Sequence, residues 1–248
     1  MSVCQWPTTA LSFSPSPPVS STNNTDRHYK TEILLKVALS TIKQTNIYIW
    51  IHLAFSTSKK KINQQGWWCK ETTQENSTDH ARDKTLIPQM SKLLSDKTVA
   101  SFGDGPGVYK REIDKLGHVK LHDPFDCAPY CEETSHGRVR FMDLSIPQYG
   151  ILQYDWIISL EVAEHIPEKY EAVYLDNIFR HAKEGIILSW TVPGQAGISH
   201  INNTPIEYIS KVMRENGFQR DAGKTMKLQA SASLSWIKSN IMVYIRNK

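Results

Sequence analysis

The sequence predicts an α/β fold, a doubly wound and largely parallel sheet, for the chain after residue 79. Three observations support this prediction. A glycine turn, Gly103-x-Gly105-x-Gly107, separates an apolar run from a segment with helical periodicity. Short apolar runs then alternate with amphipathic segments, and a last apolar run lies near the C-terminus. Regular alternation of strands and helices is typical of a sheet that helices cover on both faces.

The expected elements can be followed in order along the chain. Residues 80–94 are expected to form a helix because their apolar side chains recur on one face, and residues 99–102 a strand. After the turn a helix ends at Gly117, and a short strand ends at Asp123. The remaining expected elements are strands over 137–142, 154–160, 185–190 and 240–246, an edge strand near 218–221, and helices over 169–182, 205–216 and 225–236.

Composition divides the chain into an N-terminal extension, residues 1–79, and a folded domain, residues 80–248. Residues 1–27 are rich in Ser, Thr, Pro and Asn and are expected to be disordered. Residues 33–61 contain two apolar runs, but lysines between them favour a strand or an amphipathic segment over a membrane span. Because no secretory signal pattern is present, we expect a cytoplasmic protein, with membrane association through residues 33–61 as the alternative.

The net charge of +4 is carried by the front of the chain, and residues 98–248 are nearly neutral. A nucleic-acid groove would need a basic face, so no nucleic-acid partner is expected. The four cysteines follow no disulfide or zinc spacing. Cys127 and Cys131 would need two further ligands to hold a metal ion, so free thiols are expected.

The glycine turn is suited to a small ligand. Glycines at a junction of strand and helix let a ligand approach backbone N–H groups at the positive end of the helix. The spacing differs from the Gly-x-Gly-x-x-Gly of dinucleotide folds, and the Lys-Ser/Thr pair of a P-loop is missing. We therefore expect a nucleotide-like ligand of another kind at this turn.

Two segments resemble motifs of the class I S-adenosylmethionine-dependent methyltransferases. The glycine turn resembles motif I, in which an acidic residue stands where this chain has Ser101. The run from Tyr154 through Glu161-Val-Ala-Glu-His-Ile166 resembles motif IV. The resemblance covers about residues 98–248. It implies a Rossmann-like, seven-stranded sheet with an antiparallel last strand, S-adenosylmethionine as the cofactor, and methyl transfer as the activity.

A carboxylate one strand after the glycines can accept hydrogen bonds from both hydroxyls of a ribose. Asp123 is therefore the expected ribose contact, with a turn residue as the alternative interpretation. The resemblance implies that Asp143 meets the adenine amino group and that Leu160 and Glu161 lie along the methionine part of the cofactor. The full expected cofactor set is Ser101, Gly103, Asp104, Gly105, Gly107, Asp123, Pro124, Asp143, Leu160 and Glu161.

The loop over residues 191–204 follows a predicted strand at the same sheet edge and is expected to bind the methyl acceptor. His165 or His200 could serve as the base if the acceptor is a hydroxyl or an amine, although packing under the sheet is the alternative for His165. A small-molecule acceptor is expected, because no motif for methylation of nucleic acid, protein or lipid is recognised. The alternatives are a degenerate binding protein of this fold, motivated by Ser101, and an NAD-dependent oxidoreductase.

Overall fold

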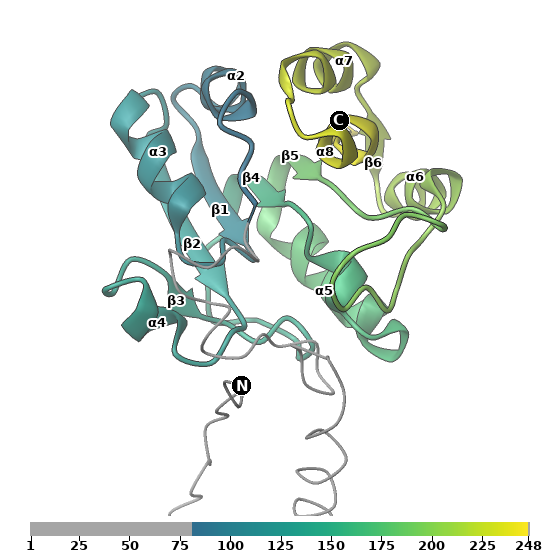
Figure 1. Cartoon of the computed structure of the whole chain (residues 1–248), viewed down its shortest axis with the longest axis horizontal. Helices are drawn as coiled ribbons and strands as arrows, with labels where there is room; N and C mark the ends of the chain where they lie inside the picture. Colours follow the sequence, from purple (N-terminus) through teal and green to yellow (C-terminus); the bar gives the residue numbers. More distant parts are fainter. Residues whose placement is uncertain (1–80, 248) are drawn as a thin grey trace, which may run out of the picture. The chain divides into compact units, whose positions relative to one another are not determined.

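The computed structural model describes residues 81–247, which form a seven-stranded sheet with helices on both faces (Figure 1). The strands are β1 (Thr98–Phe102), β2 (Leu121–Asp126), β3 (Arg140–Phe141), β4 (Tyr154–Ser159), β5 (Ala182–Leu188), β6 (Phe218–Arg220) and β7 (Met242–Arg246). The helices are α2 (Leu86–Leu93), α3 (Val108–Leu116), α4 (Cys131–Thr134), the short 3₁₀ helix Ala163–His165, α5 (Glu168–His181), α6 (Ile206–Glu215), α7 (Ala222–Ser231) and α8 (Ser235–Asn240).

The strand order in the sheet is β3-β2-β1-β4-β5-β7-β6. β1 pairs in parallel with both β2 and β4, whereas β7 runs antiparallel between β5 and β6. The chain winds outward from β1 to β3, returns to β4 and continues to the opposite edge. The predicted doubly wound sheet with an antiparallel last strand is confirmed. Open α/β sheets bind ligands where the winding reverses, which here is beyond the carboxyl ends of β1 and β4.

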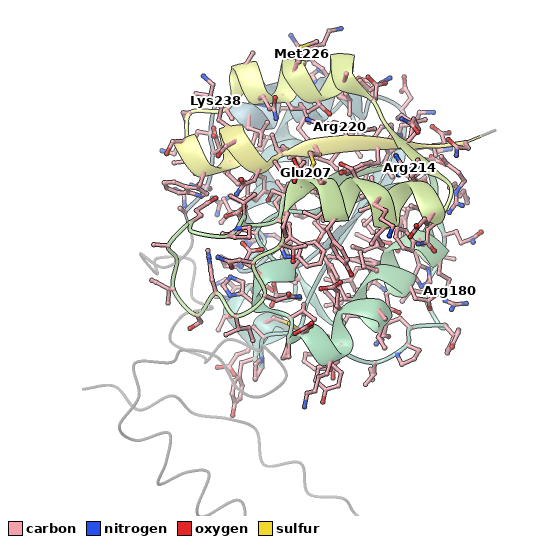
Figure 2. The ribbon with its side chains drawn as sticks, turned by 90° about the vertical axis from the view of Figure 1, so that its right-hand side faces the viewer. Arg180, Glu207, Arg214, Arg220, Met226 and Lys238 are labelled. Carbon is pink, nitrogen blue, oxygen red and sulfur yellow. The ribbon has the colours of Figure 1, made fainter. Side chains whose placement is uncertain are left out.

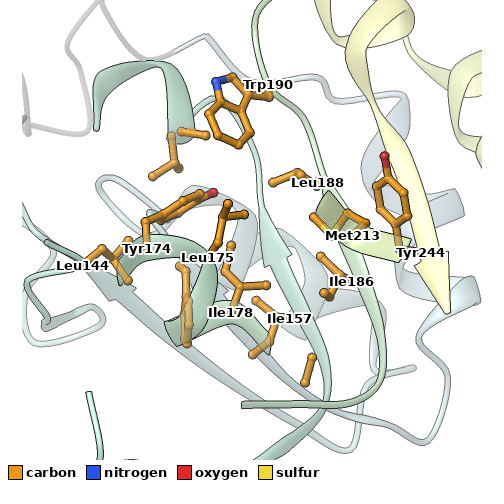
Figure 3. Close-up of a cluster of buried hydrophobic side chains, with 14 of the residues drawn as sticks. Leu144, Ile157, Tyr174, Leu175, Ile178, Ile186, Leu188, Trp190, Met213 and Tyr244 are labelled. Atoms are coloured by element: carbon orange, nitrogen blue, oxygen red, sulfur yellow. The ribbon is translucent and has the colours of Figure 1, made fainter. Parts of the chain in front are cut away.

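Each face of the sheet has its own core, because alternate residues of a strand point to opposite faces. Ile157 of β4 packs with Ile178 of α5 and Met213 of α6 (Figure 3). Its neighbours Trp156 and Ile158 belong to the opposite cluster, with side chains from α2, α3, α7 and α8. Full burial of each such apolar side chain stabilises the fold by roughly 1.5–3 kcal/mol.

Helices cover both faces of the sheet also at its edge formed by β7 and β6. Figure 2 views this edge, with α6 on one side of β6 and β7 and α7 on the other. Glu207 of α6 and Lys238 of α8 are exposed and point away from the sheet (Figure 2). The apolar faces of these helices meet the sheet and their charged faces meet solvent, as the amphipathic pattern predicts.

Several boundaries differ from the sequence prediction. The strand expected over 137–142 is reduced to β3, and the strand expected over 185–190 is β5, which begins at Ala182 and ends at Leu188. β2 continues through Asp123 and Pro124 to Asp126, so the prediction that it ends at Asp123 is wrong. A proline is tolerated within β2 because β3 pairs only with Phe125 and Asp126, which leaves Pro124 beside an open side of the ladder. The helix expected over 225–236 is divided into α7 and α8, and the helix expected over 80–94 is the shorter α2.

The expectations for residues 1–27 and 33–61, and for Cys4 and Cys69, lie outside the described residues. Cys127 and Cys131 are described, and both are free, buried thiols. Within residues 81–247, no helix combines the length and the apolar character needed to cross a bilayer.

Candidate functional site

A cavity of about 620 Å³ lies at the carboxyl ends of β1 and β4, where the winding of the sheet reverses. Its walls come from the glycine turn, the end of β2, the segment after β4, the loop over residues 195–200, and α8. Pockets for small molecules typically have volumes of roughly 300–1,000 Å³. The cavity is therefore large enough for a nucleotide-sized ligand.

The glycine turn folds back over the end of β2. The N–H groups of Gly103 and Asp104 donate to the carbonyl of Phe125 at 2.8 and 3.0 Å. Gly103 has a φ of 92°, and a Cβ there would lie 2.2 Å from Val162 Cγ2. Only glycine lets the turn approach the segment after β4 this closely.

Asp126, the last residue of β2, stands beside this turn and lines the cavity. Its buried carboxylate accepts hydrogen bonds from the N–H groups of Gly105 and Ala128, both at 2.7 Å. These two backbone donors fix the orientation of the carboxylate. An ionised carboxylate has four acceptor sites, so it can also accept hydrogen bonds from ligand hydroxyls.

Asp123 does not line the cavity. It lies in the middle of β2, opposite Ala100 of β1. Its carboxylate accepts a hydrogen bond from the Tyr154 hydroxyl at 2.7 Å and pairs with Arg140 at 3.2 Å. The physical reason is the register of β2, which places Asp126 rather than Asp123 at the carboxyl edge of the sheet.

Asp143 also lies outside the cavity lining. Its carboxylate accepts hydrogen bonds from the backbone N–H and the hydroxyl of Ser145, at 2.8 and 2.6 Å, and so closes a local turn. Of the expected cofactor and catalytic residues, the structure brings to the cavity Ser101, Gly103, Asp104, Gly105, Leu160, Glu161, His165 and His200. Four of the expected cofactor residues do not line the cavity: Gly107, Asp123, Pro124 and Asp143.

Ser101 occupies the position at which motif I has an acidic residue, and it pairs with a histidine. Ser101 Oγ lies 2.6 Å from Nε2 of His122, and both side chains are buried. Burial lowers the pKa of His122 to about 3, so its ring is neutral at physiological pH. This part of the cavity wall therefore offers a hydroxyl in a neutral pair instead of a carboxylate.

Asp104 is a buried acid within the glycine turn. Its carboxyl accepts a hydrogen bond from the N–H of Lys110 at 3.2 Å. Burial is the main cause that raises the pKa of Asp104 to about 8, and the nearby Asp126 adds to the rise. Asp104 is therefore mostly protonated at neutral pH, which reduces the negative charge at this end of the cavity.

Leu160 and Glu161 follow β4 along the opposite wall of the cavity. Glu161 has a φ of 55°, in the left-handed region that residues other than glycine rarely adopt. Its N–H donates to Ser189 Oγ at 2.8 Å, and the same hydroxyl donates to Glu161 Oε1 at 2.8 Å. One serine after β5 thus stabilises the strained backbone and orients the carboxyl group.

Glu164, His165 and His200 gather beside the cavity, and we name them the Glu164 triad. One ligand atom from each lies within 4.8 Å of the others. His200 Nε2 is 3.9 Å from Glu164 Oε1, and the two imidazole rings meet edge to face with centroids 5.2 Å apart. Burial raises the pKa of Glu164 to about 8, with the nearby Glu161 as the second cause.

The loop over residues 191–204 carries His200 to this triad. The N–H groups of Ile201 and Asn202 donate to the backbone carbonyl of Glu164 at 2.9 and 3.1 Å. These bonds tie the loop after β5 to the 3₁₀ helix after β4. Among the polar side chains of the loop, Gln195 and His200 line the cavity.

Two residues of the site, Asp126 and Glu164, were not predicted from the sequence. Asp126 is missed because Asp123-Pro124 looks like the end of a strand; extending the apolar run to Phe125 would have found it. Glu164 is missed although its spacing from Glu161 and its place beside His165 are visible in the sequence. The contact with His200 has no local signal, because the two segments lie far apart in the chain.

No protein-family model and no curated protein matches this sequence. Solved structures do resemble the fold, at low sequence identity. The sugar N-methyltransferase KedS8 from Streptoalloteichus sp. ATCC 53650 is 10% identical over 66% of this chain and 85% of that chain, with a TM-score of 0.50. The magnesium protoporphyrin IX methyltransferase ChlM from Synechocystis PCC 6803, with bound SAM, is 20% identical over 65% and 76%, with a TM-score of 0.49. A TehB-like SAM-dependent methyltransferase from Corynebacterium glutamicum ATCC 13032 is 15% identical over 84% and 99%, with a TM-score of 0.46.

The sheet topology agrees with the KedS8 likeness. The dinucleotide-binding order 3-2-1-4-5-6 has no antiparallel strand between its fifth and sixth strands, whereas β7 occupies that place here. The strand order of this sheet therefore argues against the alternative of an NAD-dependent oxidoreductase. The described residues have the fold of the class I S-adenosylmethionine-dependent methyltransferases.

Proposed function

We propose that this chain binds S-adenosylmethionine in the cavity and transfers the methyl group to a small-molecule acceptor. The observation that carries the proposal is the Asp126 carboxylate, held by Gly105 at the end of β2 and facing the cavity. A carboxylate at that point of a doubly wound sheet is suited to accept hydrogen bonds from the two hydroxyls of a ribose.

The residues of the cavity fit this cofactor in size and chemistry. Ile158, Leu160 and Ile237 supply apolar wall for a base and a thioether chain, while Glu161 supplies a carboxyl group for an amine. When bound, S-adenosylmethionine supplies an electrophilic methyl group on a sulfonium ion. The protein contributes proximity and orientation, because it holds the methyl donor and the acceptor close together and aligned. Proximity and orientation by themselves can accelerate a reaction by a large factor.

The acceptor side of the cavity is the wall that holds His165, Gln195 and His200. These side chains provide polar groups, and the exposed residues Gly197 and Ile198 line the same part of the cavity. The mixed wall favours a small molecule that has both polar and apolar parts.

The proposal is tested by calorimetric titration with S-adenosylhomocysteine. We expect saturable binding to the wild-type protein. Asp126→Asn is expected to weaken it by about tenfold or more, since hydrogen bonds to a charged group contribute about 1.5–3 kcal/mol. The matched control is Asp123→Asn, which changes the same strand outside the cavity lining and should leave the affinity unchanged.

Two outcomes contradict the proposal: a folded wild-type protein that shows no saturable binding, or an Asp126→Asn variant that binds as tightly as wild type. Methyl transfer is checked with labelled S-adenosylmethionine and fractions of a small-molecule extract. Tight binding without transfer to any fraction would favour the alternative of a binding protein without turnover.

A further inference from the structure

We infer that the Ser101–His122 pair binds the carboxylate group in the methionine part of the cofactor. This role rests on the proposed function, since it concerns S-adenosylmethionine in the same cavity. Ser101 Oγ lies 2.6 Å from His122 Nε2, and each residue is only 3% exposed. Ser101 lines the cavity, whereas His122, in the neighbouring strand β2, does not. The histidine can therefore orient the serine hydroxyl without touching the ligand.

The proton of the His122 ring has one favoured position. Burial, with the charge of Lys110 as the second cause, lowers the pKa of His122 to about 3, so the neutral ring carries a single N–H. Nδ1 of His122 is buried and has no hydrogen-bond partner among residues 81–247. Buried N–H groups without an acceptor are rarer in folded proteins than buried acceptors without a donor. The proton therefore belongs on Nε2, which donates it to Ser101 Oγ.

This proton arrangement makes Ser101 a hydrogen-bond donor towards the cavity. The serine oxygen already accepts from His122, so its own O–H is left to point into the cavity that Ser101 lines. A hydroxyl donor suits an anionic oxygen, and hydrogen bonds to an ionised acceptor are the stronger kind. An acidic side chain at the same place would repel a carboxylate. The pair therefore favours the carboxylate of the ligand over its ammonium group.

The backbone of the glycine turn does not supply this donor, because its N–H groups are used within the protein. Four of them donate hydrogen bonds to oxygens of described residues: those of Gly103, Asp104, Gly105 and Gly107. The remaining residue of the turn is Pro106, which has no N–H. An anionic group of the ligand at this end of the cavity therefore needs a side-chain donor, and Ser101 offers one.

The ammonium group of the cofactor has a separate partner in Glu161. The carboxyl group of Glu161 lines the cavity and is oriented by the Ser189 hydroxyl. β1 and β4 are adjacent parallel strands, in which Ser101 is paired with Ile158, shortly before Glu161 in the chain. An α-amino acid carries its ammonium and its carboxylate on one carbon, so it needs an acceptor and a donor near each other. The ends of these two strands supply one of each.

The test is calorimetric titration of the full chain with three probes. They are S-adenosylhomocysteine, its decarboxylated analogue, which keeps the amine, and its deaminated analogue, which keeps the carboxylate. Wild type is expected to bind the decarboxylated analogue about tenfold or more weakly than S-adenosylhomocysteine, as for loss of a hydrogen bond to a charged group. Ser101→Ala should weaken S-adenosylhomocysteine by a similar factor. It should leave the affinity for the decarboxylated analogue unchanged, because the partner of Ser101 is already missing there.

Two further variants make the test specific. Ser91→Ala is the matched control: Ser91 is buried and its Oγ lies 3.1 Å from His118 Nδ1, but this pair does not line the cavity. It should leave all three affinities unchanged. Ser101→Asp should weaken S-adenosylhomocysteine by repelling its carboxylate. If Ser101 instead accepted a hydrogen bond from the amine, Ser101→Asp would strengthen the binding.

A second measurement needs no substitution. Nuclear magnetic resonance of the wild-type protein with labelled histidine rings should show Nε2 of His122 protonated and Nδ1 unprotonated at neutral pH. A proton on Nδ1, equal wild-type affinity for S-adenosylhomocysteine and its decarboxylated analogue, or tighter binding by Ser101→Asp would overturn the inference. If a folded protein binds none of the three probes, the proposed function fails and the role of Ser101 fails with it. Tight binding of S-adenosylhomocysteine and of the decarboxylated analogue alike contradicts only the role of Ser101.

Discussion

The backbone N–H of Gly105 donates a 2.7 Å hydrogen bond to the Asp126 carboxylate, which joins the tip of the glycine turn to the last residue of β2. Gly105 lies in the turn after β1 and Asp126 ends the adjacent parallel strand β2, and both residues line the cavity. The bond therefore joins two parts of the proposed cofactor site, the glycine turn and the carboxylate at the end of β2.

Gly103→Ala is expected to lower the free energy of unfolding by roughly 2–4 kcal/mol. The added Cβ would lie 2.2 Å from Val162 Cγ2, and the φ of 92° disfavours any side chain. The matched control is Gly137→Ala, where φ is 75° and no atom lies within 4 Å of the new Cβ. The control carries only the backbone penalty of about 1 kcal/mol. Urea unfolding of both variants measures the difference, and equal losses would contradict the close approach.

Asp83→Ala is expected to destabilise the protein by about 3 kcal/mol. The Asp83 carboxylate is fully buried and accepts hydrogen bonds from the N–H of Leu86, in the first turn of α2, and from those of Ser233 and Leu234, before α8. Its loss leaves one buried donor, the N–H of Leu86, and two partly buried donors, those of Ser233 and Leu234, without their partner, each worth about 1 kcal/mol. Asp114→Ala, at an exposed ion pair, should change stability by less than about 1 kcal/mol. Urea unfolding compares the two.

The stability contribution of Asp83 is also expected to depend on pH. Burial by itself would raise the pKa of Asp83, but hydrogen bonds from Leu234, Thr85 and Ser233 outweigh it and hold the pKa below its usual value. A lowered pKa means that the stabilisation is present above about pH 4 and is lost as the pH falls through the folded-state pKa. The stability difference between wild type and Asp83→Asn should therefore shrink in acid. A difference that grows in acid would contradict this assignment.

The stability contribution of Asp104 is expected to depend on pH in the opposite direction. Its pKa is raised to about 8 by burial and by Asp126, with Lys110 and Arg138 as the nearby positive charges. A raised carboxyl pKa stabilises the fold fully below about pH 4, and this contribution is lost as the pH rises towards 8. Wild type should lose stability relative to Asp104→Asn over this range. Urea midpoints at about pH 5 and about pH 8 measure it, with Asp114→Asn as the exposed control.

Gly197→Ala is expected to displace His200 without removing it. A Cβ on Gly197 would lie 2.1 Å from His200 Nε2, so the His200 ring must move from its present position. The displacement should lower the free energy of unfolding by roughly 1–3 kcal/mol, because an added group in a packed site forces side chains out of their preferred rotamers, and urea unfolding measures it. Gly150→Ala, where the added Cβ meets no atom within 4 Å, is the control. A loss of stability in Gly197→Ala no larger than that in Gly150→Ala would contradict the close contact between Gly197 and the His200 ring.

Much of the fold could be predicted from local patterns. The strand that holds Ile157 and the helix after Gly107 follow from apolar periodicity, and the motif resemblance supplied the antiparallel last strand. The boundary at Asp123 could not be predicted, because a strand ends where its neighbours stop pairing with it. β1 pairs with β2 as far as Phe125, and β3 then pairs with Asp126, so the carboxylate at the sheet edge belongs to Asp126.

The sequence by itself determined the order of the strands, the position of the glycine turn and the segment after β4 that holds Glu161 and His165. These are local properties, set by the spacing of apolar side chains and by the conformational freedom of glycine. The tertiary structure decided which carboxylate faces the cavity and brought His200 to Glu164. Both depend on contacts between segments far apart in the chain, namely strand register and the path of the loop after β5, and no local pattern encodes them.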